Sequence, residues 1–233
     1  MALKLNQICP LFNPESFTNS FILLKDSVFQ QGGFFLSDFL DVLSKNSANG
    51  LVLMGIEQNF AHYLNISKKL GSNLETLINA GQLLYIDLFS KFSDWITSEL
   101  PITEEPPLTW KEVPKKAEVF SVFSEENLEK LFDKIEAFSQ TKGKTWVFID
   151  NLNMFVNSFE SSKMSMSFIN SFLELLKMKN KNFNLLILGT IDDENPMNLK
   201  LIQLLELSAN IVIEIQQNPS GFSQDIDGNV MFF

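Results

Sequence analysis

The sequence contains no arginine: all 18 of its basic residues are lysines. A chain without arginine cannot supply an arginine finger or a bidentate guanidinium clamp, so any phosphate contact must come from lysine, backbone N–H groups or another chain. The chain also carries 28 acidic residues, and its net charge of −10 repels a polyanion at long range. A protein that binds nucleic acid on its own is therefore not indicated.

Cysteine and histidine are almost as scarce. The one cysteine, Cys9, cannot form an intrachain disulfide, and one histidine, His62, does not support a zinc cluster. No uninterrupted apolar run approaches the roughly 18–20 residues that span a bilayer, and residues 1–6 lack a secretory hydrophobic stretch. We therefore expect a soluble protein of the cytoplasm, or of both cytoplasm and nucleus, without a membrane partner.

Length and apolar content indicate one folded domain. With 233 residues, of which 45% are hydrophobic and 23 are phenylalanine, the chain can bury a substantial core. Apolar runs typical of buried strands alternate with segments whose apolar residues recur at helical spacing. This alternation predicts an α/β fold of the RecA-like, P-loop-NTPase type, with a mainly parallel sheet flanked by helices. One domain is expected over residues 1–233, with an exposed excursion containing proline and glutamate at about 90–114.

The predicted elements follow one another along the chain. Strands are predicted at 20–24, 51–56, 82–88, 146–150, 183–189 and 209–215. Helices are predicted at 32–45, 59–70, 124–138, 164–178 and 197–207, with a short one near 92–96. Asp227-Gly228 is a hairpin signal, so the chain is expected to end in an antiparallel hairpin of strands near 222–226 and 230–233.

The turn after the first strand lacks the residues that grip a nucleotide. P-loop proteins use G-x-x-x-x-G-K-[ST], in which the lysine contacts phosphate and the hydroxyl contacts Mg²⁺. Here residues 25–35 read KDSVFQQGGFF, so Gly32 and Gly33 are present without the loop lysine and the hydroxyl. We interpret the two glycines as a tight turn and the entry to a helix, although their backbone N–H groups could also bind an anion weakly.

Two acids at strand ends are candidate remnants of a nucleotide site. Asp150 ends the strand 146–150, where nucleotide-binding α/β proteins hold Mg²⁺, but such strands also end in aspartate because the following turn favours it. Glu57 closes the second strand, where RecA-like ATPases often keep a carboxylate that activates water. Because no phosphate lysine accompanies these acids, we predict no catalytic residue, cofactor or metal. Gly32, Gly33, Glu57 and Asp150 are treated as vestigial positions.

Lysine clusters are the candidates for contact with nucleic acid. They are Lys115, Lys116, Lys177, Lys179 and Lys181. The last three lie where a helix is predicted to end, so their charges could simply complement the helix dipole. Aromatic residues do not interleave with the lysines, and a base-stacking surface is therefore not indicated. A solvated lysine face is the alternative for each cluster.

Five segments, taken in order, resemble one known family. They are NFAHY at 59–63, KLG at 69–71, AGQL at 80–83, VFIDNL at 147–152 and GFSQDIDG at 221–228. Together they resemble the sixth subunit of the Elongator complex, and the similarity runs from the first strand to the final hairpin. We expect relatives in that family to continue past residue 233.

The resemblance implies a RecA-like fold without nucleotide-binding motifs and a subunit without catalytic activity. It also implies partners: the fourth and fifth Elongator subunits, in a heterohexameric ring that binds tRNA and serves the modification of wobble uridines. The modifying chemistry belongs to a different subunit, and the family supplies no catalytic residue for this chain. Two alternatives remain open: a divergent nucleotide-binding ATPase, and a free-standing RecA-like signalling protein that binds neither RNA nor a ring.

Overall fold

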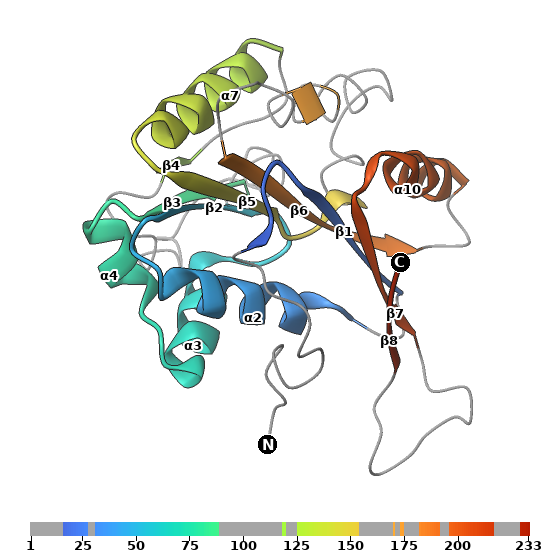
Figure 1. Cartoon of the computed structure of the whole chain (residues 1–233), viewed down its shortest axis with the longest axis horizontal. Coiled ribbons are helices and arrows are strands. Elements are labelled where there is room, and N and C mark those ends of the chain that lie inside the picture. The colour runs from blue at the N-terminus through green and yellow to red at the C-terminus, as the bar shows by residue number, and fades with distance from the viewer. Residues whose placement is uncertain are drawn as a thin grey trace, which may run out of the picture.

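One twisted sheet lies between two layers of helices in the computed structural model of the chain (Figure 1). The structure describes residues 16–27, 31–88, 118–119, 125–153, 170, 173–174, 182–191, 196–216 and 229–233. Within these ranges, no helix is both long enough and apolar enough to cross a bilayer. The predicted excursion at 90–114 lies outside the described residues, as do the helix near 92–96 and nearly all of the helix at 164–178.

Eight strands form the sheet in the order β4-β3-β2-β5-β6-β1-β7-β8. They are β1 (Phe21–Ser27), β2 (Asn49–Gly55), β3 (Leu83–Asp87), β4 (Glu118–Val119), β5 (Lys144–Ile149), β6 (Asn182–Ile191), β7 (Ile211–Gln216) and β8 (Asn229–Phe232). Every neighbouring pair is parallel except β7 and β8. The predicted mainly parallel α/β sheet is confirmed. The first strand is central: Leu24 pairs with Leu188 of β6 on one side and with Ile213 of β7 on the other.

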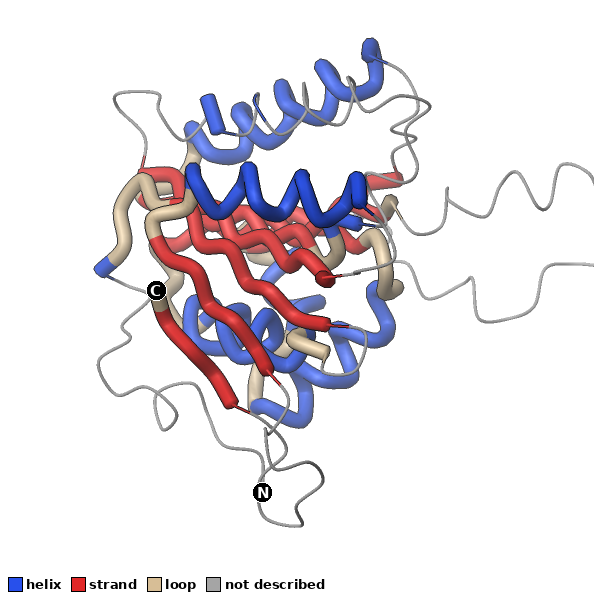
Figure 2. The backbone as a smooth tube through the Cα atoms, turned by 90° about the vertical axis from the view of Figure 1, so that its right-hand side faces the viewer, coloured by secondary structure: helices blue, strands red, loops and turns tan. Residues whose placement is uncertain are grey.

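Helices cover both faces of the sheet (Figures 1 and 2). The described helices are α2 (Gly33–Ser44), α3 (Phe60–Leu70), α4 (Leu74–Asn79), α7 (Glu125–Gln140) and α10 (Pro196–Ser208). Side chains of β1 alternate between two buried clusters: Ile22 and Leu24 pack with α2, α3 and α4, whereas Phe21 and Leu23 pack with α7 and α10. Because a parallel sheet with two covered faces needs apolar residues at successive positions, its strands read as continuous apolar runs in the sequence.

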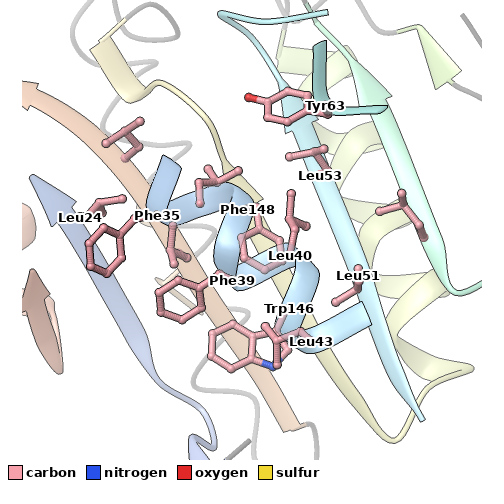
Figure 3. Close-up of a cluster of buried hydrophobic side chains, with 14 of the residues drawn as sticks. Leu24, Phe35, Phe39, Leu40, Leu43, Leu51, Leu53, Tyr63, Trp146 and Phe148 are labelled. Atoms are coloured by element: carbon pink, nitrogen blue, oxygen red, sulfur yellow. The ribbon is translucent and has the colours of Figure 1, made fainter. Parts of the chain in front are cut away.

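Aromatic side chains fill the space between α2 and the sheet (Figure 3). Phe39 of α2 lies beside Trp146 of β5, whereas Phe35 of α2 lies nearer to Leu24 of β1 (Figure 3). All of these side chains, and Phe148 of β5, are fully buried. The ring centroids of Phe39 and Trp146 are 6.2 Å apart, as are those of Trp146 and Phe148. Pairs at such distances add about 0.5–1.5 kcal/mol beyond the apolar area that they bury. This packing fixes where α2 begins relative to the strand ends.

Local signals explain the limits of α3. The Asn59 side chain accepts the His62 backbone N–H, and Gly71, in the left-handed region at φ 100°, ends the helix. These limits agree with the predicted helix at 59–70. The six-residue helix α4 was not predicted, although Asn73 caps it by accepting the Glu75 N–H. Its single turn is too short to give a recognisable apolar period.

The C-terminal antiparallel hairpin is present, but the partner of its last strand differs from the one expected. Strand β8 pairs with β7, with Ile213 opposite Phe232, whereas the sequence suggested a strand near 222–226. Residues 217–228 lie outside the described residues. Pairing with β7 extends a sheet that already has a core, whereas an isolated two-stranded hairpin is only marginally stable in water.

Candidate functional site

A cavity of about 660 Å³ lies at the edge of the sheet where the parallel strands β1, β2, β5 and β6 end. The beginning of α2 and one side of α3 complete its walls. In open α/β sheets, ligands bind outside the carboxyl ends of the strands, so this is where a nucleotide would be sought. Among the described residues, four carboxylates and no lysine line the cavity: Asp26, Asp38, Glu57 and Asp150.

Asp150 directly follows β5, and its side chain is engaged by the turn between β2 and α3. The carboxylate is only 2% exposed. Its Oδ1 accepts the backbone N–H groups of Ile56 at 2.8 Å and Glu57 at 3.2 Å. Its Oδ2 accepts the N–H groups of Glu57 and Gln58, both at 3.2 Å, and the Tyr63 hydroxyl at 2.7 Å. Both oxygens are thus occupied by donors of the chain itself, which leaves Asp150 poorly placed to coordinate Mg²⁺.

Burial governs the ionisation of this network. Desolvation raises the pKa of Asp150 to about 6, and the hydrogen bonds from Tyr63 and from the backbone of residues 56–58 limit the rise. Burial, together with the neighbouring Asp150 charge, raises the pKa of the Tyr63 hydroxyl well above its usual value. At neutral pH, Asp150 is therefore mainly ionised, and Tyr63 remains a hydrogen-bond donor.

Glu57 lies two residues after the end of β2, close to the predicted strand end, and it lines the cavity. Its carboxylate Oε2 accepts the Asn151 side-chain N–H at 3.0 Å, and its own backbone N–H donates to Asp150. Glu57 and Asn151 thereby join the turn after β2 to the turn after β5. The structure brings Glu57 and Asp150 together because β2 and β5 are neighbours in the sheet.

Gly32 and Gly33 form the entry to α2, as predicted. The Gly32 N–H donates to Asp26 Oδ2 at 2.6 Å, so a carboxylate of the chain itself lies beside the start of α2, where a nucleotide-binding loop would hold phosphate. A Cβ on Gly32 would lie 2.8 Å from Ile215 Cδ1, whereas a Cβ on Gly33 would meet nothing within 4 Å. Gly32 is therefore closely packed, whereas Gly33 has open space around its Cα.

Asp26 is a site residue that the sequence analysis did not select. It lies near the end of β1, is 3% exposed, and its Oδ1 has no hydrogen-bond partner. Burial raises the pKa of Asp26, and the Glu57 charge adds to the rise, while the Gly32 N–H and the Thr190 hydroxyl oppose it. The available signal was an acid at the end of an apolar strand, the same signal that pointed to Asp150.

Asn153 is a second residue that sequence reasoning missed. Its side-chain Nδ2 donates to the Thr190 carbonyl at 2.5 Å, and its Oδ1 accepts the Thr190 N–H at 3.0 Å. This pair of bonds imitates one step of a β-ladder and joins the turn after β5 to the end of β6. Together with the hydrogen bonds of Asp150 and Glu57, these bonds connect the ends of β2, β5 and β6.

His62 does not belong to a group of potential metal ligands among the described residues. Its ring packs edge-on against Tyr63, with the ring centroids 5.5 Å apart, and it borders the cavity. Among the described residues, no group of three or more histidine, cysteine, aspartate or glutamate side chains is arranged to hold a metal ion. The candidate lysines lie outside the described residues: Lys115, Lys116, Lys177, Lys179 and Lys181.

The charge of the described side chains in the cavity is opposite in sign to the charge that a nucleotide-binding site needs. A bound triphosphate needs lysine, backbone N–H groups and Mg²⁺ to balance its charge. Here the cavity residues contribute carboxylates instead, and the Gly32 N–H already serves Asp26. Negative charge focused in a concave site repels an anion and attracts a cation.

Comparisons with solved structures identify the fold. An uncharacterized protein from Pyrococcus horikoshii, solved in complex with an unknown peptide, matches with a TM-score of 0.65 at 12% identity, over 93% of this chain and 84% of that one. A KaiC-like protein from Pyrococcus horikoshii OT3 matches with a TM-score of 0.57 at 10% identity, over 92% of this chain and 77% of that one. At these identities the likeness establishes only the RecA-like fold. A search of curated proteins found no match.

A family model matches almost the entire sequence. The model describes Elongation complex protein 6, and the match extends over residues 3–233. It therefore includes β1, the cavity and the final hairpin. The match also includes the segments at 59–63 and 147–152, which contribute Tyr63 and Asp150 to the site. The chain belongs to the Elongation complex protein 6 family, the family of the sixth subunit of Elongator.

Proposed function

We propose that this Elongator subunit is non-catalytic and joins the fourth and fifth subunits in a heterohexameric ring, which binds tRNA and supports the modification of wobble uridines. The observation that carries the non-catalytic part is the acidic cavity at the strand ends. No lysine among the described lining residues accompanies its carboxylates, and Asp150 accepts hydrogen bonds from the turn after β2. Family membership supports the place in Elongator.

The absence of nucleotide binding is tested on the purified full chain. Titration with labelled ATP and Mg²⁺ is expected to give no saturable binding, because neither the loop lysine nor a free Asp150 carboxylate is available. Hydrolysis is expected to stay at the buffer rate. Saturable binding that unlabelled ADP displaces would instead favour the divergent-ATPase alternative.

Ring assembly receives support from apolar side chains that remain on the surface. Leu207 of α10 is 86% exposed and Phe233 is 68% exposed, and exposed apolar side chains of this size are suited to packing against partner subunits. We expect the chain to be poorly soluble or to self-associate alone, and to be stabilised by co-expression with the fourth and fifth subunits. Light scattering and size-exclusion chromatography measure both states. A monodisperse monomer that ignores both partners would favour the free-standing signalling alternative.

Binding of tRNA is proposed for the assembled ring rather than for this chain alone. The net charge of −10 and the absence of arginine leave the isolated chain without a broad basic face. Lys115–Lys116 and the lysines at 177, 179 and 181 are the candidates to contribute to a shared site. Replacing each group with glutamate should leave assembly intact, weaken tRNA binding and flatten its salt dependence. Unchanged binding in both variants would assign these lysines to a solvated face.

The proposed compartment follows from the proposed assembly. A subunit that serves tRNA modification belongs in the cytoplasm, and the same complex can also be present in the nucleus. Cell fractionation with antibodies against this chain and one partner subunit tests the proposal. The two proteins are expected to co-fractionate.

A further inference from the structure

Among the described residues, no lysine forms an ion pair with the three acids that lie at strand ends beside the cavity. Asp26, Glu57 and Asp150 come from three different strand ends, and Asp38 comes from α2. The lysine nearest in sequence, Lys25, belongs to the opposite face of the sheet, where it bonds with Glu206 and lies 2.7 Å from Glu214. It cannot serve the cavity without breaking this buried ion cluster.

The three carboxylates from the strand ends are not equally available. Asp150 receives hydrogen bonds on both oxygens, and Glu57 receives one from Asn151. Asp26 lines the cavity and is 97% buried, its Oδ2 accepts the Gly32 N–H, and the nearby Thr190 hydroxyl also favours its charged form. Its Oδ1 has no hydrogen-bond partner. A buried charged oxygen without a partner is costly, so this atom identifies the point at which a donor would stabilise the protein most.

The lining of the cavity also includes apolar side chains. Ile66 and Leu70 of α3 and Phe34 of α2 line it with apolar surface, and each is partly exposed. A volume of about 660 Å³ also far exceeds the space that a single ion needs. A cavity lined by both apolar side chains and carboxylates suits a ligand with a hydrocarbon stem and a cationic head, because long basic side chains lie on proteins in this way.

An arginine side chain suits the carboxylates of Asp26 and Glu57 better than a lysine side chain or a metal ion does. A guanidinium group presents five N–H donors in one plane and can bridge two acceptors, whereas an ammonium group is a compact and strongly hydrated point charge. Asp26 and Glu57 are close enough for the Glu57 charge to affect the Asp26 carboxyl. Within the described residues, no metal-binding group of acids exists at this edge. Since the sequence contains no arginine, the side chain must come from another protein.

We propose that this cavity receives the arginine side chain of a partner polypeptide, with its guanidinium group between Asp26 and Glu57 and its methylene stem against Ile66 and Leu70. The cavity that corresponds in position to a nucleotide-binding site would then bind a protein side chain instead; we call it the arginine socket. The inference deepens the proposed function, since a neighbouring subunit of the assembly is the source of the arginine. It makes no use of tRNA or of ATP.

Charge recognition is tested on the purified full chain with two labelled pentapeptides, one with a central arginine between glycines and one with citrulline, its neutral isostere, in the same place. Fluorescence anisotropy at low ionic strength should show the arginine peptide binding about tenfold or more tightly than the citrulline peptide. In Asp26→Asn and Glu57→Gln the two peptides should bind alike. Asp133→Asn, which changes an exposed acid on α7, is the matched control and should keep the difference.

Both variants are designed to remain folded. An asparagine at position 26 can still accept the Gly32 N–H, and a glutamine at position 57 can still accept from Asn151, so circular dichroism should be unchanged. Equal binding of both peptides to the native chain, or no binding of either, would overturn the proposal. So would binding of Mg²⁺ or Mg-ATP that is lost in Asp26→Asn while the arginine peptide does not bind.

A second experiment uses the assembly itself. A photoreactive p-benzoylphenylalanine is placed at position 66, the chain is co-expressed with the fourth and fifth subunits, and the cross-linked peptide is identified by mass spectrometry. The peptide should contain an arginine, and replacing that arginine with glutamine should abolish the cross-link. A cross-linked peptide without arginine counts against the arginine socket. Failure to co-purify with these subunits contradicts the proposed assembly but leaves the peptide titration valid, so the two failures are distinguishable.

Discussion

Asp150 and Asp26 lie at the same edge of the sheet and are both almost completely buried, at 2% and 3% exposure. Asp150 accepts hydrogen bonds from three backbone N–H groups and from Tyr63, and thereby holds the turn after β2 in place. Asp26 accepts one backbone N–H and leaves Oδ1 without a partner. The position of an acid at a strand end therefore does not reveal its role. The donors around the acid decide whether it supports the fold or remains available to a ligand.

The largest expected effect comes from removing the well-satisfied acid. Asp150→Ala should lower the free energy of unfolding by about 3–5 kcal/mol, because it leaves a hydroxyl and several N–H groups buried without an acceptor. Urea denaturation of the full chain measures the loss. The exposed Asp133→Ala on α7 is the control and should change stability by less than about 0.5 kcal/mol. If Asp150→Ala lowered the free energy of unfolding as little as the control does, Asp150 would not stabilise this edge of the sheet.

The second prediction uses pH to separate Asp150 from other acids. Its pKa is about 6 in the folded protein and near 3.8 in the unfolded chain, so the folded state binds more protons between these values. The contribution of Asp150 to stability is therefore greatest below about pH 4 and decreases as pH rises through 6, by about 3 kcal/mol in all. Denaturation of wild type and Asp150→Asn from pH 5 to 7.5 should show a difference that grows as pH falls. A pH-independent difference would contradict the raised pKa.

The third prediction contrasts two buried tyrosines. Tyr63 donates its hydroxyl to Asp150, whereas the buried Tyr85 hydroxyl has no partner. Tyr63→Phe should cost about 1.5–3 kcal/mol, because the lost hydrogen bond goes to a charged acceptor. Tyr85→Phe removes an unsatisfied buried hydroxyl and should be neutral or stabilising by up to about 1 kcal/mol. Thermal denaturation of the two single variants compares them directly, and equal losses would remove the distinction.

The fourth prediction concerns the turn that holds Asp26. Gly32→Ala should destabilise the protein by about 1–3 kcal/mol, because its Cβ would crowd Ile215 and Asp26 in a packed region. Gly33→Ala, one residue later, meets open space and begins α2, so it should stabilise by about 0.5–1 kcal/mol. The pair serves as its own control in urea denaturation. The opposite order would mean that the turn is not packed against β7.

The smallest change in the free energy of unfolding is expected for Asp26, the acid whose Oδ1 has no hydrogen-bond partner. Asp26→Asn should change the free energy of unfolding by less than about 1 kcal/mol, because it removes a buried charge and keeps an acceptor for the Gly32 N–H. Stability and peptide binding should therefore separate in this variant. A loss as large as that of Asp150→Ala would show that the two acids play the same structural role.

Much of the fold could be predicted because buried strands and long helices leave periodic apolar patterns. The strand at 146–150 and the helix at 59–70 carry strong local signals, namely an unbroken apolar run in one and an Asn–Gly pair of caps in the other. Short elements were missed because two residues in β4 and six in α4 are too few to show a period. The partner of β8 was missed for a different reason: pairing with β7 depends on the sheet as a whole.

The site was only partly predictable. The sequence selected Glu57 and Asp150 because acids at strand ends are a local pattern, but their partners depend on tertiary contacts. Asp150 meets Tyr63 across 87 positions, and Asn153 meets Thr190 across 37. Asp26 carries the same local pattern as Asp150, but its place in the cavity and its bond to Gly32 depend on how the chain folds after β1. Residue type alone does not distinguish Asp26, whose Oδ1 has no hydrogen-bond partner, from Asp150, whose two oxygens both accept hydrogen bonds.

The strand order also has a consequence for the time course of synthesis. Strand β1 leaves the ribosome first, yet its neighbours in the sheet are β6 and β7, and the second of these ends about 190 residues later. At about 5–20 residues per second, the apolar β1 waits roughly 10–40 s for its partners. Such long-range pairing slows folding and exposes aggregation-prone surface during that interval. The nascent chain is therefore expected to depend on chaperones until its last third has been made.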